Sequence, residues 1–344
     1  MFSPAALKAL DRPLSLIGMP SALLANKLMA STKRPEQGEA LIIRPGGMGD
    51  LILLCIACEE LGLPPQQLYW LIESRSAKWA RHLGLRYLCY DGQPTACLAL
   101  AAAFATVINT EQYFGLAQSA GILARAPGGK LVCFSTNRGS AWADMRVAYD
   151  PGGTHESIQF SRLLYAGLGL SSKPLASRPI RQRRVPATRP PVVGIAGLQS
   201  SARRFSLDEW FGFVRSWAGL RDFVVCPTAV DEPFARELCS RLGKRATLFQ
   251  GEFPELCELI SSAEDVFTVD GGFLHIASYY GVPATAVFTA QWDEKWAPLG
   301  NPSFVIRRRD LKCQPCARFA QVPPCRFDYR CRCVDYSTHT SQVV

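Results

Sequence analysis

Charged residues are scarce in this chain, and long uninterrupted apolar runs are missing. Only 19% of the 344 residues are charged and 48% are hydrophobic, a composition that excludes intrinsic disorder and is rich enough in apolar side chains for two cores. No window holds the roughly 18 consecutive apolar residues of a membrane-spanning helix. The N-terminus lacks the basic, apolar and small-residue cleavage pattern of a signal peptide. We therefore expect a cytoplasmic protein with two domains.

Positive charge is in excess, since 38 Lys and Arg residues face 29 Asp and Glu residues, for a net charge of +9. This balance favours anionic partners such as nucleotides, phospholipid headgroups or nucleic acid. Residues 1–34 carry apolar side chains at helical intervals with Lys and Arg beside them. Such a helix either packs on the protein's own surface or lies in a membrane interface, here the inner face of the membrane. Both readings stay open.

The order of apolar and polar residues predicts four parts along the chain, before a fifth, cysteine-rich part at residues 311–336. A helical segment, residues 1–38, precedes residues 39–173, where β-rich runs such as "ALIIRP" and "TVINTE" alternate with helical stretches. Residues 174–191, "PLASRPIRQRRVPATRPP", lack any hydrophobic period and read as a linker. The alternation restarts over residues 192–310. We expect two doubly wound, Rossmann-like α/β lobes facing a cleft, with ligands at the carboxyl ends of the strands.

A glycine-rich loop, "RPGGMGD", follows the first strand of the first lobe and ends at Asp50. Gly46, Gly47 and Gly49 are spaced too tightly for a dinucleotide fingerprint, and the loop has no Lys-Ser/Thr pair for a P-loop. Glycines at these positions allow another molecule to approach the backbone closely. Asp50 is then either a plain cap of the following helix or a carboxylate with a chemical role.

A second loop, "VDGGFLHIASYYG", leaves a strand of the second lobe. Asp270 precedes Gly271 and Gly272, and a helix is expected to begin near Phe273. Free N–H groups and the dipole at such a helix start suit a diphosphate. His275, one turn further, either donates to that phosphate or is a buried core residue.

A third loop, "AGLQSSARRFSLDEW", places Arg203 and Arg204 just before a predicted capping box that starts at Ser206. Arginine at this position can bind phosphate through two parallel hydrogen bonds, or it can remain solvated.

Four stretches in this order resemble glycosyltransferase family nine, the bacterial heptosyltransferases: "LIIRPGGMGDLILL", "SSARRFSLDEW", "VVCPTAVDE" and "VFTVDGGFLHIASYYGVPATAVFTAQWDEKWAPLG". The resemblance spans roughly residues 40 to 335. It implies the GT-B architecture, with the acceptor in the first lobe and the nucleotide sugar in the second. The implied reaction is inverting transfer of a heptose, most simply from ADP-heptose, to a hydroxyl of a protein or of the lipopolysaccharide core, without a catalytic metal.

The resemblance also implies roles for particular residues. Asp50 falls on the family's proposed general base, beside an acceptor loop of Gly46, Gly47 and Gly49. Arg203 falls on the basic phosphate contact, which is usually a lysine, and Phe205 stands where tryptophan often follows. The implied nucleotide-sugar site contains Arg203, Asp270, Gly271, Gly272, Phe273 and His275. The arginine at position 203 and the phenylalanine at position 205 depart from the family pattern. These departures bear on the identity of the sugar and the acceptor more than on the type of reaction.

Thirteen cysteines are present, and five of them fall within residues 311–336: Cys313, Cys316, Cys325, Cys331 and Cys333. A Cys-x-x-Cys pair followed by further cysteines is typical of a tetrahedral zinc or iron site, and nearby arginines favour thiolates. Disulfides or unliganded thiols are the alternatives. We expect a small C-terminal finger holding a structural metal through Cys313, Cys316, Cys325 and Cys333, with Cys331 as the substitute.

Some heptosyltransferases that modify autotransporter proteins resemble this segment, because they carry a cysteine-held iron near the C-terminus and assemble into rings; the resemblance implies a homo-oligomer. Five other cysteines lie within apolar segments and are expected to be reduced core residues: Cys55, Cys58, Cys226, Cys239 and Cys257.

Two other functions compete with transfer. The chain could be a catalytically silent nucleotide-binding scaffold of the same fold, assembled through the metal finger. Alternatively, the cysteines and arginines could form a nucleic-acid-binding finger. Nucleic acid is not the expected partner, because the basic residues are scattered over the linker and tail, without an aromatic stacking surface.

Overall fold

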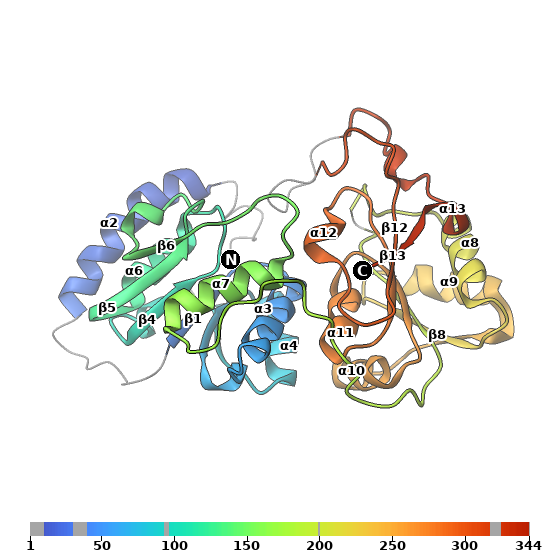
Figure 1. Ribbon diagram of the computed structural model, residues 1–344, viewed down its shortest axis with the longest axis horizontal. Helices are drawn as coiled ribbons and strands as arrows, with labels where there is room; N and C mark the ends of the chain where they lie inside the picture. The colour runs from blue at the N-terminus through green and yellow to red at the C-terminus, as the bar shows by residue number, and fades with distance from the viewer. Residues whose placement is uncertain (1–9, 30–39, 93–95, 199, 317–324, 344) are drawn as a thin grey trace. The chain divides into compact units, whose positions relative to one another are not determined.

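The computed structural model describes residues 10–29, 40–92, 96–198, 200–316 and 325–343. The chain forms two compact units, residues 1–177 and 178–344, each built around its own parallel sheet (Figure 1). The architecture is therefore the predicted pair of Rossmann-like α/β lobes. Residues 174–191 contain no helix or extended strand, as expected for a segment without a hydrophobic period.

The first unit has a six-stranded sheet in the order β3-β2-β1-β4-β5-β6, with every neighbouring pair parallel. Its strands are β1 (Ala40–Arg44), β2 (Tyr69–Ile72), β3 (Arg86–Cys89), β4 (Phe104–Asn109), β5 (Arg125–Phe134) and β6 (Met145–Val147). The order reverses between β1 and β4. In doubly wound sheets ligands bind at this switch point, beyond the carboxyl ends of the two strands.

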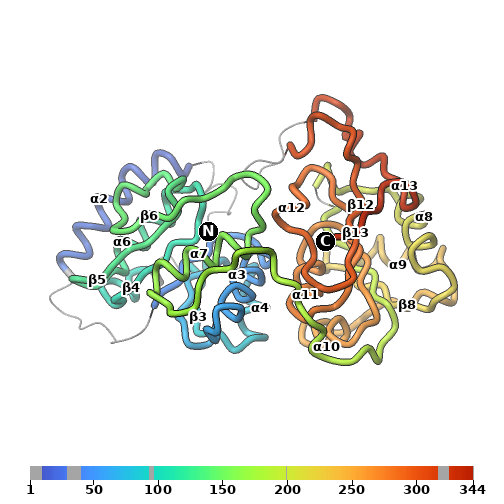
Figure 2. The backbone as a smooth tube through the Cα atoms, viewed as in Figure 1, coloured from blue at the N-terminus to red at the C-terminus, as the bar shows by residue number. Residues whose placement is uncertain are grey.

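Helices cover both faces of the first sheet, as the packing of two glycines demonstrates. Gly121 of α6 lies against Leu131, whereas Gly167 of α7 lies against Val132. Neighbouring residues of a strand point to opposite faces, so α6 and α7 lie on opposite sides of β5. The helices of this unit are α2 (Asp11–Met29), α3 (Met48–Glu60), α4 (Ala77–His82), α5 (Ala96–Ala99), α6 (Leu116–Ala124) and α7 (Glu156–Leu168). Figure 2 shows α2 running alongside α6.

The second unit repeats the same strand order and adds one edge strand. Its sheet has the order β13-β12-β11-β10-β7-β8-β9, parallel except for β13. The strands are β7 (Val192–Ile195), β8 (Phe223–Pro227), β9 (Ala246–Leu248), β10 (Val266–Val269), β11 (Ala284–Val287), β12 (Phe304–Ile306) and β13 (Thr340–Gln342). The helices are α8 (Leu207–Ala218), α9 (Glu232–Leu242), α10 (Phe253–Ser262), α11 (Gly272–Tyr280), α12 (Asp293–Trp296) and α13 (Tyr336–His339). The switch point lies between β7 and β10.

Successive residues of β7 point to opposite faces of the sheet and pack against different helices. Val193 and Ile195 join the aromatic cluster under α8, which includes Trp210, Phe213 and Phe267. Gly194 points the other way, and a Cβ there would lie 2.5 Å from the ring of Phe273 in α11. The predicted capping box is confirmed, because the Ser206 hydroxyl accepts from the Glu209 N–H and the Glu209 carboxylate accepts from the Ser206 N–H.

The cysteines predicted to be core residues are reduced, and four of the five are buried: Cys55, Cys58, Cys226 and Cys257. Cys239 is only half-buried, because it lies near the solvent-facing side of α9. Among the described residues, no helix has the length and apolar content needed to cross a membrane.

Candidate functional site

The first candidate site lies where β1 runs into α3. Gly47 is the N-cap of α3 and makes no side-chain cap, and Asp50 is the third residue of the helix. The plain-cap interpretation of Asp50 is therefore wrong. Its carboxylate instead pairs with the Arg44 guanidinium at 3.2 Å, and its side chain remains 26% exposed. The Asp50 carboxylate is thus paired with a buried cation and remains partly accessible to solvent.

Arg44 ends β1 and is buried, which a charge tolerates only when it is well paired. Its Nη1 donates to the Thr110 carbonyl oxygen at 2.9 Å, so the guanidinium bridges the switch point between β1 and β4. Burial lowers the pKa of Arg44, but the negative charges of Asp50, Glu111 and Glu156 outweigh burial, and the pKa is raised overall. Sequence reasoning missed Arg44 as a site residue. A charge that ends an otherwise apolar strand, directly before a glycine loop, was the available signal.

The glycine loop leaves room for this ion pair. Gly46 has φ +136°, and a Cβ there would lie 3.0 Å from Nη2 of Arg44 and 3.2 Å from Oδ2 of Asp50. Any larger residue would be strained and would also crowd the pair. A Cβ at Gly47 would meet open space, and Gly49 lies in the first turn of α3. The loop is thus shaped at Gly46 by the ion pair and remains open at Gly47.

The second candidate site lies at the switch point of the second sheet, between the loops that follow β7 and β10. Nη1 of Arg203, from the first of these loops, donates to the Asp270 carbonyl oxygen at 2.7 Å and lies 3.9 Å from its carboxylate. Gly271 is the N-cap of α11, which begins at Gly272. The arginine and the helix start thus lie together, a combination suited to a phosphate group. The Arg203 side chain is 29% exposed.

Phe273 and His275 are both buried in α11, with 5% and 4% of their surface exposed. The Phe273 ring fills the space left by Gly194 in β7, so it packs the helix onto the sheet. Among the residues predicted for the nucleotide-sugar site, the structure brings together Arg203, Asp270, Gly271 and Gly272. It buries the side chains of Phe273 and His275 in α11.

The cysteine segment packs on two loops of the second unit, the loop after β7, which belongs to this second site, and the loop after β11. The N–H of Cys316 donates to the Ala290 carbonyl oxygen at 3.1 Å, after β11, and Nη1 of Arg332 donates to the Arg204 carbonyl oxygen at 2.5 Å. Cys316 and Tyr329 also contact Ala202 and Ala290 in a small apolar cluster. Part of the predicted finger, residues 317–324, lies outside the described residues.

Electrostatic interactions link four of the five tail cysteines, and the fifth, Cys333, interacts with an arginine. Burial, followed by the nearby thiols of Cys316, Cys325 and Cys313, raises the pKa of Cys331 to about 11. Cys333 is exposed and interacts instead with Arg308. Cys325 Sγ accepts the N–H groups of residues 327 and 329 at 3.4 and 3.2 Å. In the part of the chain that the structure describes, however, no three or more His, Cys, Asp or Glu side chains form a group that could hold a metal ion.

Part of the second unit matches a known protein family. Residues 225–325 match the model of glycosyltransferase family 9 (heptosyltransferase). The match begins in β8 and ends within the cysteine segment, so it includes the Asp270 loop. No curated protein sequence matches the chain significantly.

Solved heptosyltransferases share the fold. The Escherichia coli heptosyltransferase WaaC with ADP has a TM-score of 0.57 and 17% identity, covering 76% of this chain and 94% of WaaC. E. coli ADP-heptose lps heptosyltransferase II has a TM-score of 0.62 and 14% identity, covering 79% and 91%. A family 9 glycosyl transferase from Veillonella parvula has a TM-score of 0.61 and 12% identity, covering 82% and 92%. The chain therefore has a GT-B-like fold.

Proposed function

We propose that this protein is a family 9 glycosyltransferase that moves a heptose from a nucleotide sugar, ADP-heptose, to a hydroxyl of the lipopolysaccharide core or of a protein. The family match on the second unit supports the transferase activity. The donor is suggested by the related structures, because E. coli WaaC was solved with ADP and also with ADP-2-deoxy-2-fluoro heptose. The observation that carries the proposal is the Arg44–Asp50 pair at the switch point of the first sheet.

In the proposed reaction Asp50 takes the proton of the acceptor hydroxyl while that oxygen attacks the anomeric carbon. A new carbon–oxygen bond forms and the bond to the diphosphate breaks, so ADP leaves with the bonding electrons. One displacement inverts the anomeric centre. Arg44 orients the Asp50 carboxylate, because Nη2 of its buried guanidinium lies 3.2 Å from Oδ2 of Asp50.

The second site would stabilise the leaving group. Arg203 and the N–H groups at the start of α11 present positive charge and hydrogen-bond donors to the departing diphosphate. The glycines at positions 271 and 272 keep side chains away from these donors. We propose that no catalytic metal is needed, since these groups supply the charge stabilisation.

Calorimetry and one substitution test the proposal. Titration with ADP, UDP, GDP, CDP and ADP-heptose is expected to show selective binding of ADP that the sugar strengthens. Asp50→Asn should lower kcat by about 10² to 10⁴-fold, the usual contribution of a general base, while leaving ADP affinity unchanged. Asp208→Asn, at an exposed position of α8, is the matched control and should keep full activity.

Two results would overturn parts of this proposal. Absence of binding to every nucleotide would leave the catalytically silent scaffold as the better interpretation. ADP binding with unchanged turnover in Asp50→Asn would retain the transferase but remove Asp50 as its base.

We also propose a structural zinc or iron ion in the cysteine segment, held by Cys313, Cys316, Cys325 and Cys331. The support for this ion is the chemistry of the donors, since four thiols are the ligands of structural zinc and iron–sulfur sites, and not their arrangement, because the described side chains form no metal-binding group. In this set Cys331, the substitute in the sequence-based prediction, takes the place of Cys333. Cys331 is buried and interacts electrostatically with the other three cysteines, whereas Cys333 is exposed. When bound, the ion would hold the cysteine segment against the loops of the donor site, as in a closed structural centre without an open coordination position.

A further inference from the structure

Helix α2 is fixed along α6 at both of its ends. The Asp11 carboxylate accepts the N–H groups of Gly115 and Leu116 at 3.0 and 2.8 Å, at the start of α6. Near the other end, Asn26 Nδ2 donates to the carbonyl oxygens of Leu123 and Arg125. These bonds fix which face of α2 points inward.

The outward face of α2 is apolar, and it is exposed because none of the described residues covers it. Ile17 and Leu24 lie seven residues apart and are 70% and 62% exposed. Seven residues make two helical turns, so the pair belongs to one stripe. The exposed apolar side chains of this helix and of the residue before it are Leu10, Leu14, Leu16, Ile17, Leu24 and Leu28. So many large exposed apolar side chains on one helix mark an interaction surface.

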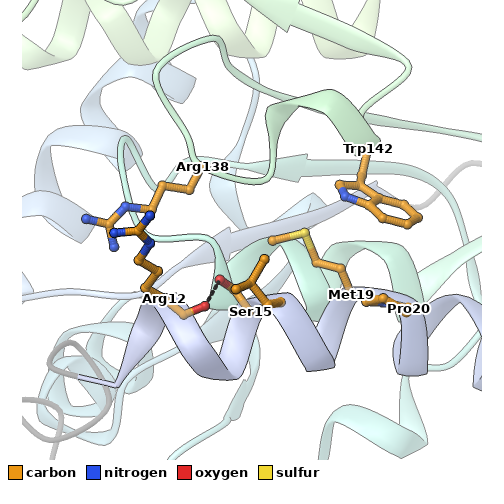
Figure 3. Close-up of a pocket in the computed structure, with 7 residues that line it drawn as sticks. Arg12, Ser15, Met19, Pro20, Arg138 and Trp142 are labelled. Carbon is orange, nitrogen blue, oxygen red and sulfur yellow. Dashed lines mark hydrogen bonds between the residues drawn. The ribbon is translucent and has the colours of Figure 1, made fainter.

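A pocket of about 400 Å³ opens between α2 and the turn that carries Trp142 (Figure 3). Its apolar lining consists of Leu16, Met19, Pro20 and Trp142. The polar side chain of Ser15 also lines the pocket. Arg12 and Arg138 lie together at one end of the pocket, away from Trp142. The pocket thus combines an apolar body with a cationic end, which matches an anionic amphiphile.

The exposed charges of α2 itself have one sign. Asp11 is the only acidic residue of this helix, and it is 1% exposed and paired with Arg138 at 3.0 Å. The exposed charges of α2 are Arg12 and Lys27. A second copy of this face would bring positive charge against positive charge. An anionic lipid surface is complementary, and interfacial helices have this arrangement of apolar and basic residues.

We propose that the outward face of α2 and the Trp142 pocket dock this protein on an anionic phospholipid bilayer. The apolar stripe enters the boundary between headgroups and acyl chains, and Trp142 lies at the same depth, where tryptophan is enriched. The pocket takes one lipid, with its phosphate at Arg12 and Arg138 and the start of its acyl chain along the apolar lining. This inference is independent of the proposed transferase activity.

Flotation of the full-length protein with vesicles tests the inference, without any nucleotide present. Vesicles of phosphatidylcholine alone are compared with vesicles containing phosphatidylglycerol. The wild type should float with the anionic vesicles, and higher salt should weaken binding because headgroup attraction is screened. Ile17→Glu/Leu24→Glu and Arg12→Glu should each reduce binding by about tenfold or more, since each removes apolar insertion or reverses a contacting charge.

Leu220→Glu is the matched control, because Leu220 is 82% exposed in the second unit and lies outside this surface. It should bind as the wild type does, and far-ultraviolet circular dichroism of all variants should coincide. Equal binding to neutral and anionic vesicles, or loss in Leu220→Glu as large as in the α2 variants, would overturn the inference. So would wild-type self-association that Ile17→Glu/Leu24→Glu abolishes in the absence of lipid, because the face would then be an interface between copies.

Discussion

The Arg44–Asp50 pair depends on one buried cation with several partners. We expect Arg44→Met to lower the free energy of unfolding of the first unit by about 2 kcal/mol or more, because Glu111, Glu156 and Asp50 lose their shared counter-charge. Arg44→Lys should recover only part of this loss, since an ammonium group cannot reproduce the planar set of donors that reaches both Asp50 and Thr110. Urea unfolding measures both changes.

Lys78→Met is the control for this series, because Lys78 is an exposed cation on α4 of the same unit. An equal loss in Lys78→Met and Arg44→Met would mean that burial of the Arg44 charge contributes nothing specific.

We expect substitution of Cys331 and of Cys333 to have different effects on the metal content. Cys331→Ser should abolish stoichiometric zinc or iron in protein purified without chelators, because it removes one of four proposed sulfur ligands. Cys333→Ser should leave the metal content unchanged, since Cys333 is exposed and contacts Arg308 instead. Elemental analysis of both variants decides between them. Equal metal content in the two variants and the wild type would exclude Cys331 as a ligand, and absence of metal from all three would exclude the site.

At the scale of elements, α8 begins with a complete capping box and carries the aromatic core of the second unit. Ser206→Ala removes the hydroxyl that accepts the Glu209 N–H, so we expect a loss of about 1 kcal/mol in the free energy of unfolding. Ser216→Ala, at an exposed position inside the same helix, should be neutral or slightly stabilising. Thermal unfolding compares the two. A larger loss in Ser216→Ala would contradict the capping role.

Packing of α11 on the sheet positions the start of this helix in the second site. Its start lies beside Arg203, while Phe273 fills the space above Gly194. The glycine in β7 therefore determines how closely the start of α11 approaches the sheet. The donors proposed for the diphosphate are positioned by this packing and not by the loop alone.

At the scale of the whole molecule, a ligand should stabilise only the unit that binds it. ADP at about 100 times its Kd should raise the free energy of unfolding by about 2.7 kcal/mol, seen as a shift of the thermal transition of the second unit. Arg203→Ala should reduce this shift, because the phosphate loses a charged donor. Asp50→Asn should keep it, since Asp50 belongs to the first unit. A shift lost in Asp50→Asn and retained in Arg203→Ala would reverse the assignment of the two units.

The sequence by itself determined the elements and the loops that matter. Alternating β-rich runs and amphipathic helices predicted two parallel sheets. The glycine loop before Asp50 and the glycines after Asp270 marked the ends of two strands. The capping box at Ser206 was also readable. These features depend on side-chain period, on turn chemistry and on hydrogen bonds between residues close in the chain. Local physics therefore suffices to predict them.

Only the tertiary structure decided which side chains meet. Thr110 lies 66 residues beyond Arg44, and nothing in the local pattern of "ALIIRP" reveals the partners of that arginine. In the same way, the two-residue difference between Cys331 and Cys333 is invisible as spacing but places one thiol in the interior and the other in solvent. The structure also decides which face of α2 is buried against α6 and which face is exposed. Burial and ion pairing are set by the packing of segments distant in sequence, so the chain had to fold before they could be assigned.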